Sequence, residues 1–283
     1  MTAINVILQR DVAHIVTDSA FYDLDGYVQG FAPKAVTIPH WPGILAVRGP
    51  MLGMALLLAE ASIKFRNIDE FADGAEAFLA DYCKRHHEAL TQWGGPPAIE
   101  VHAVGVSPST GGCRGFYVNS QPGEEDPDTL LSDDFDYLSA GPAPVVALTE
   151  VNVPDIIVAP LPPDEFWGEV RASGFGGNLA ALDHSAIRRL GTKILKAQRL
   201  ETGTHFEGGE HHHFVGGFPV FMTLKRDGTI TTSIGEAWAD KVGERIDPSQ
   251  DREAERDAAP DLAHMSRQQR RQFERLKRER SAA

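Results

Sequence analysis

Short runs of apolar and β-branched residues, separated by polar turns, occupy the first fifty positions of the chain. Residues 4–9 and 12–17 are two such runs on either side of a polar pair, a pattern typical of a β-hairpin. Asp25-Gly26 indicates a second turn, and two further runs, at 34–38 and 43–47, predict strands. The N-terminal part is therefore expected to be β-structure.

Helical spacing begins after Pro50, which stands where a first-turn proline is favoured. In the first of two predicted helices, the apolar positions that recur every three or four residues are Leu52, Leu56, Ala59 and Ile63. The second helix is expected to begin after the N-cap residue Asn67 and to end before the Gly-Pro segment 94–97. Its inward-facing positions are predicted to be Phe71, Ala75, Phe78, Leu79 and Tyr82.

Strand patterns return in the second half of the chain. Strands are predicted at 99–106, 114–119 and 145–148, and a hairpin at 218–224 and 229–234 around Asp227-Gly228. A helix is predicted at 187–200, capped by Asp183. The acidic stretch 120–140 is interpreted as a solvated loop, and the Pro-rich stretch 142–163 as an irregular connection.

The order of these elements predicts a mixed α/β (α+β) fold, in which antiparallel sheets carry helices on their outer faces. One domain is expected over residues 1–240, followed by a charged, partly helical C-terminal tail over 241–283. The residues predicted to form the core are Ile4, Val6, Leu8, Ile44, Leu45, Leu56, Leu57, Phe78 and Ile194.

Composition excludes several classes of protein. The chain has 283 residues, of which 42% are apolar, as in globular proteins. No uninterrupted apolar stretch reaches ~18 residues, and no signal-peptide pattern opens the sequence, so no membrane association is expected. The two cysteines, Cys83 and Cys113, are too few for a disulfide framework or a four-thiolate metal site. A cytoplasmic location is therefore expected.

The net charge of −13 is unevenly distributed along the chain. Residues 266–283 contain seven Lys or Arg and two Glu, a balance of +5, which leaves −18 on the other 265 residues. So acidic a body disfavours nucleic acid as a partner. The basic segment is interpreted either as a helix that docks on an acidic surface or as a solvated helix.

Three residues near the N-terminus stand at equal spacings. Thr2, Asp18 and Lys34 are each separated by sixteen positions, and Ser19 follows Asp18. Together with the strand–hairpin–strand–helix order, this pattern resembles the N-terminal-nucleophile hydrolases, specifically the proteasome β-subunit group and its bacterial and prophage relatives. The resemblance implies a four-layer α/β/β/α sandwich, with two antiparallel sheets between two helix layers.

The resemblance also implies a role for each of the three residues. Once Met1 is removed, the α-amine of Thr2, with a reference pKa of ~7.7–8.0, can accept the proton of its own hydroxyl nucleophile. Lys34 supplies positive charge that favours the deprotonated amine and hydroxyl, and Asp18 pairs with Lys34 and holds it in place. A threonine-type peptidase or amidase, acting on a peptide or amide without a cofactor, is therefore expected.

Two other parts of the family pattern differ in this chain. For the glycine whose N–H forms the oxyanion hole, strict spacing gives Arg48, and Gly49 fits with a shift of one residue. The family's Asp-x-x-Ser-Gly-Gly motif corresponds to residues 212–217, where His212 replaces the Asp, Val215 replaces the Ser, and the glycine pair is kept. Gly49 and His212 complete the set of candidate site residues.

The histidine-rich segment 204–214 contains residue types that bind metals, namely His205, Glu207, Glu210 and His211 to His213. Consecutive histidines on a strand alternate between its two faces, so at most two of the three can converge. The segment also lacks the helical His-Glu-x-x-His spacing. No metal site is predicted.

Three functions remain open at this level. The first is a hydrolase that uses Thr2; the second is a catalytically silent structural or assembly component, such as part of a phage particle; the third is a metal-dependent hydrolase using the histidines. A homo-oligomer or incorporation into a larger, virion-associated assembly is expected. The apolar residues predicted to form the association surface are Met51, Met54, Phe65 and Tyr82.

Overall fold

The computed structural model describes residues 2–91, 98–120, 142, 144–170, 179–203 and 210–251. The chain divides into two compact units, Met1–Ile246 and Asp247–Ala283, and the account below concerns the first. The loop expected beyond residue 120 and the basic segment 266–283 lie outside the described residues. The expected domain boundary after residue 240 stays a prediction.

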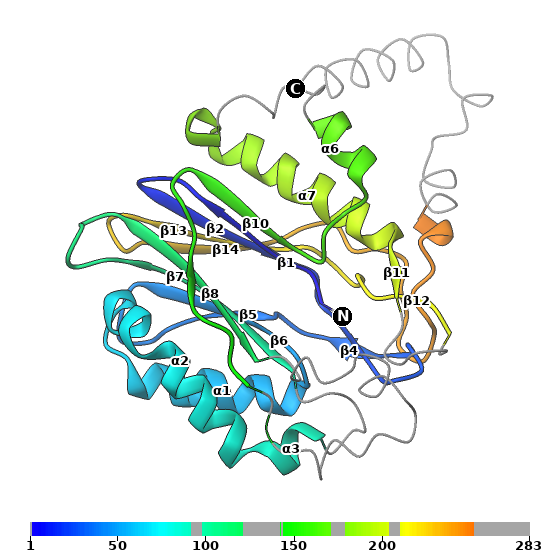
Figure 1. The fold of residues 1–283 in the computed structure, drawn as a ribbon. Helices are drawn as coiled ribbons and strands as arrows, with labels where there is room; N and C mark the ends of the chain where they lie inside the picture. The colour runs from blue at the N-terminus through cyan, green and yellow to red at the C-terminus, as the bar shows by residue number, and fades with distance from the viewer. Residues whose placement is uncertain are drawn as a thin grey trace. The chain divides into compact units, whose positions relative to one another are not determined.

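Five antiparallel strands form the sheet that contains the N-terminal hairpin (Figure 1). Their order across the sheet is β10 (Asp155–Ala159), β1 (Ile4–Leu8), β2 (Val12–Thr17), β13 (Val220–Lys225) and β14 (Ile230–Ile234). The predicted hairpins β1–β2 and β13–β14 are both confirmed, and Gly228 in the second turn has a φ of +84°. The β1–β2 and β13–β14 hairpins thus lie side by side in one sheet, because β2 pairs with β13.

Strand β10 corrects the interpretation of the Pro-rich stretch as irregular. Residues 155–159 pair with the whole of β1, whereas the strand predicted at 145–148 contributes only a bridge between Val145 and Ser120. Proline cannot donate a ladder hydrogen bond, but the prolines at 154 and 160 flank β10 on an edge strand, where they are tolerated. The helix α6 (Asp164–Val170) was also not predicted.

The second large sheet also has five antiparallel strands. Their order is β5 (Ala35–Thr37), β6 (Gly43–Arg48), β7 (Ile99–Val106), β8 (Cys113–Ser120) and β9 (Thr149–Glu150). The strands predicted at 43–47, 99–106 and 114–119 are confirmed to within one residue at each end.

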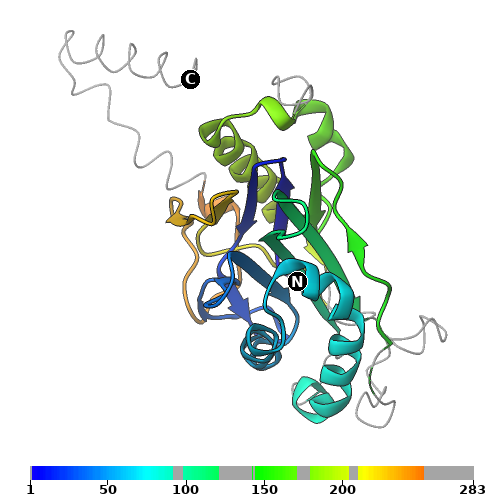
Figure 2. The same ribbon diagram turned by 90° about the vertical axis from the view of Figure 1, so that its left-hand side faces the viewer.

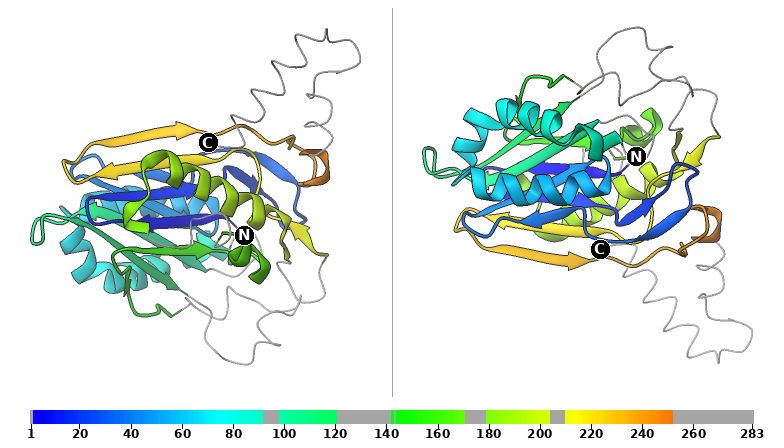
Figure 3. Two further views of the ribbon diagram at one scale, coloured as in Figure 1. Left: turned by 90° about the horizontal axis from the view of Figure 1, so that it is seen from above. Right: turned by 90° about the horizontal axis from the view of Figure 1, so that it is seen from below.

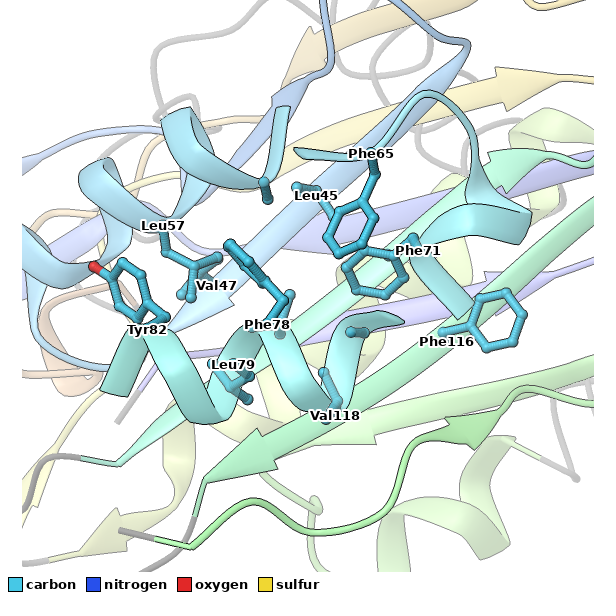
Figure 4. Close-up of a cluster of buried hydrophobic side chains, with 14 of the residues drawn as sticks. Leu45, Val47, Leu57, Phe65, Phe71, Phe78, Leu79, Tyr82, Phe116 and Val118 are labelled. Atoms are coloured by element: carbon cyan, nitrogen blue, oxygen red, sulfur yellow. The ribbon is translucent and has the colours of Figure 1, made fainter. Parts of the chain in front are cut away.

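Three helices connect β6 to β7: α1 (Met51–Lys64), α2 (Ile68–Arg85) and α3 (His87–Thr91). The predicted N-cap Asn67 is confirmed, because its side-chain oxygen accepts the backbone N–H groups of Asp69 and Glu70, each at 2.9 Å. Buried side chains of α1 and α2 pack against the sheet in one cluster, which Figure 4 shows. Its labelled members are Leu45, Val47, Leu57, Phe65, Phe71, Phe78, Leu79, Tyr82, Phe116 and Val118.

The buried face of α1 differs from the predicted stripe. Leu57 is fully buried, whereas Leu56 is 36% exposed and Ile63 is 80% exposed, so Leu56 was wrongly assigned to the core. Most of the first nine residues of α1 are apolar, so periodicity could not select the inward face, and packing against α2 selects it instead. The other residues predicted to be in the core are buried: Ile4, Val6, Leu8, Ile44, Leu45, Leu57, Phe78 and Ile194.

The predicted association surface needs a similar correction. Phe65 and Tyr82 are buried within the cluster beneath α1 and α2, so they are not available to a partner. Met51 is half exposed, and Met54 is partly buried. The exposed apolar side chains of this region therefore lie on α1.

The first sheet is covered by α6 and by α7 (His184–Leu200), whose predicted cap Asp183 is confirmed by a 2.7 Å bond from the Ala186 N–H. Ile187 and Ile194 of α7 pack with Ile7 of β1, and Figure 3 shows α7 lying along the strands. The alternate β1 residues pack with residues of β6 and β7 in another cluster. Figure 2 shows strands between the helices α6 and α7 and the helices α1 and α2.

Two short sheets complete the described part of the first unit. One pairs β3 (Ala20–Tyr22) with β4 (Val28–Phe31), and the other pairs β11 (Thr202–Gly203) with β12 (His212–His213). The whole is a mixed α+β structure with antiparallel sheets, as predicted. No helix in the described ranges is long and apolar enough to cross a membrane.

Candidate functional site

A buried ion pair joins the ends of two strands. Asp18 directly follows β2, and Lys34 directly precedes β5. The Lys34 Nζ atom donates to both Asp18 carboxylate oxygens, at 2.8 and 2.9 Å. The two side chains are 0% and 6% exposed, so this contact is shielded from solvent and from salt.

Thr2 lies beside this pair because of the register of the first hairpin. Ile4 pairs with Thr17, so the next residues outward, Ala3 and Asp18, face each other. The Ala3 N–H donates to Asp18 Oδ1 at 3.0 Å. The carboxylate that holds the Lys34 ammonium group therefore also fixes the backbone next to Thr2.

Tyr22, in β3, is a further residue at the site. A side-chain hydrogen bond joins Tyr22 to Thr2, and the Tyr22 ring lies 5.2 Å from that of Phe214. Burial, with the charge of Asp18, raises the pKa of Tyr22 well above its usual value, so the phenol stays protonated. No sequence motif pointed to Tyr22, because β3 comes close to Thr2 only in the folded chain.

Burial is also the largest influence on Lys34. It lowers the pKa of the ammonium group below its usual value; Asp18 opposes this shift, and Arg48 reinforces it. Among the described residues, Asp18 is the only hydrogen-bond partner of Lys34 Nζ. An ammonium group makes up to three hydrogen bonds, so Lys34 Nζ keeps donor capacity beyond its two contacts with Asp18.

A third segment, the loop between β12 and β13, closes around Asp18 and Ser19. The Gly216 N–H donates to Asp18 Oδ2 at 3.1 Å, and the Gly216 carbonyl accepts the Ser19 N–H at 3.1 Å. The Phe218 N–H donates to Ser19 Oγ at 2.8 Å. Asp18 thus receives the Lys34 ammonium group and backbone N–H groups from two separate segments, as a buried carboxylate requires.

Arg48 and Gly49 lie at the end of β6. Arg48 pairs with Glu100 at 3.1 Å, and Glu100 in turn bonds to the buried His102 at 2.6 Å. Gly49 has a φ of +142°, and a Cβ there would lie 2.7 Å from the Ala98 carbonyl oxygen. Only glycine fits this position, so the chain can turn sharply out of the sheet here.

His212 is a neighbour of Phe214, whose ring also lies near that of Tyr22. It is on β12, its ring is 6.0 Å from that of Phe214, and it packs against Gly26. Burial lowers its pKa, which favours the neutral imidazole. Within the described ranges, no hydrogen bond joins His212 to Thr2, Asp18 or Lys34.

The described histidines do not assemble a metal site. His211, His212 and His213 are all described, and no group of three or more His, Cys, Asp or Glu side chains among the described residues could hold a metal ion. His205 and Glu207 lie outside the described residues.

The structure therefore brings together Asp18, Lys34 and the backbone next to Thr2, and it adds Tyr22 to them. This arrangement holds a positive charge in a buried setting, and such a charge can stabilise an alkoxide or an oxyanion that forms within its reach. The sequence matches no protein-family model, and no curated protein matches it significantly.

Proposed function

We propose that the first unit is a four-layer α/β/β/α sandwich of the N-terminal-nucleophile type, and that the chain is a proteasome-β-like N-terminal threonine amidohydrolase. The observation that carries this proposal is the threefold use of the Asp18 carboxylate. It binds the Lys34 ammonium group at 2.8 and 2.9 Å, the Ala3 N–H at 3.0 Å and the Gly216 N–H at 3.1 Å. The fold contributes further support, because α1 and α2 pack on one large sheet and α6 and α7 on the other.

The reaction requires residue 2 to be the N-terminus. The Thr2 hydroxyl attacks the carbonyl carbon of an amide or peptide, and the free α-amine of Thr2 accepts the hydroxyl proton. That proton then passes to the leaving nitrogen as the C–N bond breaks, which leaves an ester on Thr2 Oγ. Water hydrolyses this ester, with the amine again as the base.

The other residues act on charge. Lys34 stabilises the negative charge that develops on the Thr2 hydroxyl, and Asp18 holds the ammonium group in position. The chain turns out of β6 at Gly49, and we assign the oxyanion-binding N–H to this segment, at Arg48 or Gly49. The Tyr22 phenol, protonated because its pKa is raised, orients the Thr2 hydroxyl through their hydrogen bond.

The test is covalent labelling of the purified full chain. Intact mass shows whether Met1 is removed, and a peptide α′,β′-epoxyketone then reports the nucleophile, because it closes a ring with both the hydroxyl and the amine of an N-terminal threonine. The wild-type protein is expected to gain one label at Thr2. Thr2→Ala abolishes the label, and hydrolysis of amide substrates falls by ~10³-fold or more.

Lys34→Met, which removes the positive charge, is expected to slow labelling strongly while Thr2 remains in place. The matched control is Lys241→Met, at a lysine whose side chain is 65% exposed, and it should label like the wild type. A protein that has lost Met1 but takes no label, or that labels equally well after Thr2→Ala, would refute the proposal.

A second candidate function is a catalytically silent scaffold in an assembly, and the exposed apolar face of α1 favours it. The exposed residues on this face are Met51, Ala55, Leu56, Ala59 and Ile63. A face of this kind suits contact with further copies of the chain or with a larger particle. Retained Met1, no label and a defined oligomer together would support the scaffold over the enzyme.

A further inference from the structure

A second buried ion pair lies behind the loop that contacts Asp18. Arg199, in the last turn of α7, donates from Nη2 to Asp240 Oδ1 at 2.7 Å and from Nη1 to Asp240 Oδ2 at 2.8 Å. Both side chains are 2% exposed, and the guanidinium group lies 4.8 Å from the centre of the Trp238 ring. A two-point contact of this kind fixes direction as well as distance.

The pair holds the loop between β12 and β13 at two places. Arg199 Nη1 also donates to the Val215 carbonyl at 2.8 Å, and Asp240 Oδ2 accepts the Gly217 N–H at 2.7 Å. Gly216 lies between these two anchored residues. Its N–H is the one that donates to Asp18 Oδ2.

Close contacts restrict the backbone conformation of this loop. A Cβ on Gly216 would lie 2.8 Å from Asp240 Oδ2, and a Cβ on Gly217 would lie 2.3 Å from Ser19 Oγ. Gly217 also has a φ of +81°, which glycine adopts without strain. The backbone here is thus packed tightly between the Arg199–Asp240 pair on one side and Asp18-Ser19 on the other.

We infer that Arg199 and Asp240 are positioning residues for the site: they fix the Gly216 N–H, which fixes the Asp18 carboxylate and, through it, the Lys34 ammonium group beside Thr2. This inference rests on the proposed function for its catalytic meaning. The contacts themselves run without a break from α7 to the end of β2 and on to the start of β5.

The inference has a consequence for ionisation at Lys34. The charged groups that act on Lys34 are Asp18, which favours the ammonium form, and Arg48, which disfavours it along with burial. If Asp18 is displaced, its support weakens while burial remains. The pKa of Lys34 then falls further, so the ammonium group loses its proton at a lower pH.

The test compares two variants of the full chain with a control. Asp240→Asn keeps an acceptor for the Gly217 N–H but weakens the bond to Arg199, whereas the double variant Arg199→Met/Asp240→Leu removes both charges and leaves none buried alone. Arg114→Met breaks the ion pairs with Asp69 and Glu150 at the opposite end of the strands, where the Cys113 N–H donates to the Arg10 carbonyl. It serves as the control for the loss of ion pairs away from the site.

Each variant is first shown to be folded by its cooperative unfolding in urea, and two quantities are then measured. The first is the rate of epoxyketone labelling against pH, and the second is the titration of the Lys34 side chain by ¹³C NMR. We expect labelling to slow by about 10–100-fold, less in Asp240→Asn than in the double variant, because small displacements at a reacting group are costly. The alkaline limb of the labelling profile and the Lys34 titration should both move to lower pH, and Arg114→Met should change neither.

The outcomes separate this inference from the proposed function. If the folded double variant labels at the wild-type rate and Lys34 titrates unchanged, the pair is merely structural and the inference is overturned. If the wild type takes no label but the double variant still shifts the Lys34 titration, the positioning role stands and the proposed function fails.

Discussion

Burial of His14 in the first sheet makes the stability of the fold depend on pH. His14 is 3% exposed, its Nδ1 atom lies 3.0 Å from Thr223 Oγ1, and its ring is 5.9 Å from that of His184. Burial, assisted by His184, lowers the pKa of His14 from 6.5 to about 4. The fold therefore favours the neutral imidazole.

The size and sign of the effect follow from this shift. The folded pKa lies below the unfolded one, so the stabilisation is complete above pH 6.5 and is lost as the pH falls through 6.5 to about 4. At ~1.4 kcal/mol per pKa unit, the difference is worth ~3 kcal/mol of unfolding free energy. This is a large share of the 5–15 kcal/mol that is ordinary for a domain.

Urea unfolding between pH 4 and pH 7.5 measures the contribution. The double variant His14→Leu/Thr223→Val removes the titrating ring and the hydroxyl that bonds to it. As the pH falls from 7.5 to 4, the wild type should therefore lose ~3 kcal/mol more unfolding free energy than the double variant. His211→Gln, at an exposed histidine, is the control and should follow the wild type. If the wild type and the double variant lose stability in parallel, His14 is not held neutral by the fold.

Three further predictions concern packing and association. Leu57→Ala should lower the unfolding free energy by about 2–5 kcal/mol, because Leu57 is fully buried. Leu56→Ala, one position away, should change it by less than ~0.5 kcal/mol. Equal effects in urea titrations would mean that the inward face of α1 is misassigned. Gly217→Ala should cost at least ~1–3 kcal/mol and slow labelling of Thr2, because its Cβ would strike Ser19 Oγ in a positive-φ conformation; a stable, fully reactive variant would contradict the tight packing of this loop. Ile63→Glu should leave stability unchanged, because the side chain is 80% exposed, but should weaken self-association in sedimentation velocity; an unaltered oligomer would place the interface elsewhere.

The sequence predicted an element correctly where the residues within a few positions of it favour a single structure. The β1–β2 and β13–β14 hairpins and the caps Asn67 and Asp183 follow from turn and cap chemistry that acts within a few residues. The inward face of α1 did not follow, because an apolar helix offers several faces of similar hydrophobicity. Only the shape of the partner surface on α2 and the sheet selects Leu57 over Leu56.

Strand β10 was missed for a related reason. Its five residues are flanked by prolines, which in a single sequence are typical of irregular connections. What makes it a strand is the exposed edge of β1, with which it pairs along its entire length. That edge exists only after the hairpin has formed, so no window of sequence around 155–159 contains the information.

The residues of the candidate site also differ in whether the sequence could point to them. Thr2, Asp18 and Lys34 were selected by their resemblance to the N-terminal-nucleophile hydrolases. In the structure, one antiparallel turn returns the chain to the end of the sheet where it began and sets Ala3 opposite Asp18. Lys34 follows after a second excursion through β3 and β4.

Arg199 and Asp240 have no such relation to the site. They come from the end of one helix and from a segment 41 residues further on, and each meets the loop at 215–217 only in the folded chain. A buried arginine bonded at two points to a buried aspartate is costly to desolvate, so hydrophobic packing alone does not explain why a fold would retain it. Its contacts with the Val215 carbonyl and the Gly217 N–H supply a reason, because they fix the one backbone N–H of this loop that reaches Asp18. On this inference, the Asp18 carboxylate that holds the Lys34 ammonium group is positioned from two directions: by the register of the β1–β2 hairpin, through the Ala3 N–H, and by the Arg199–Asp240 pair, through the Gly216 N–H.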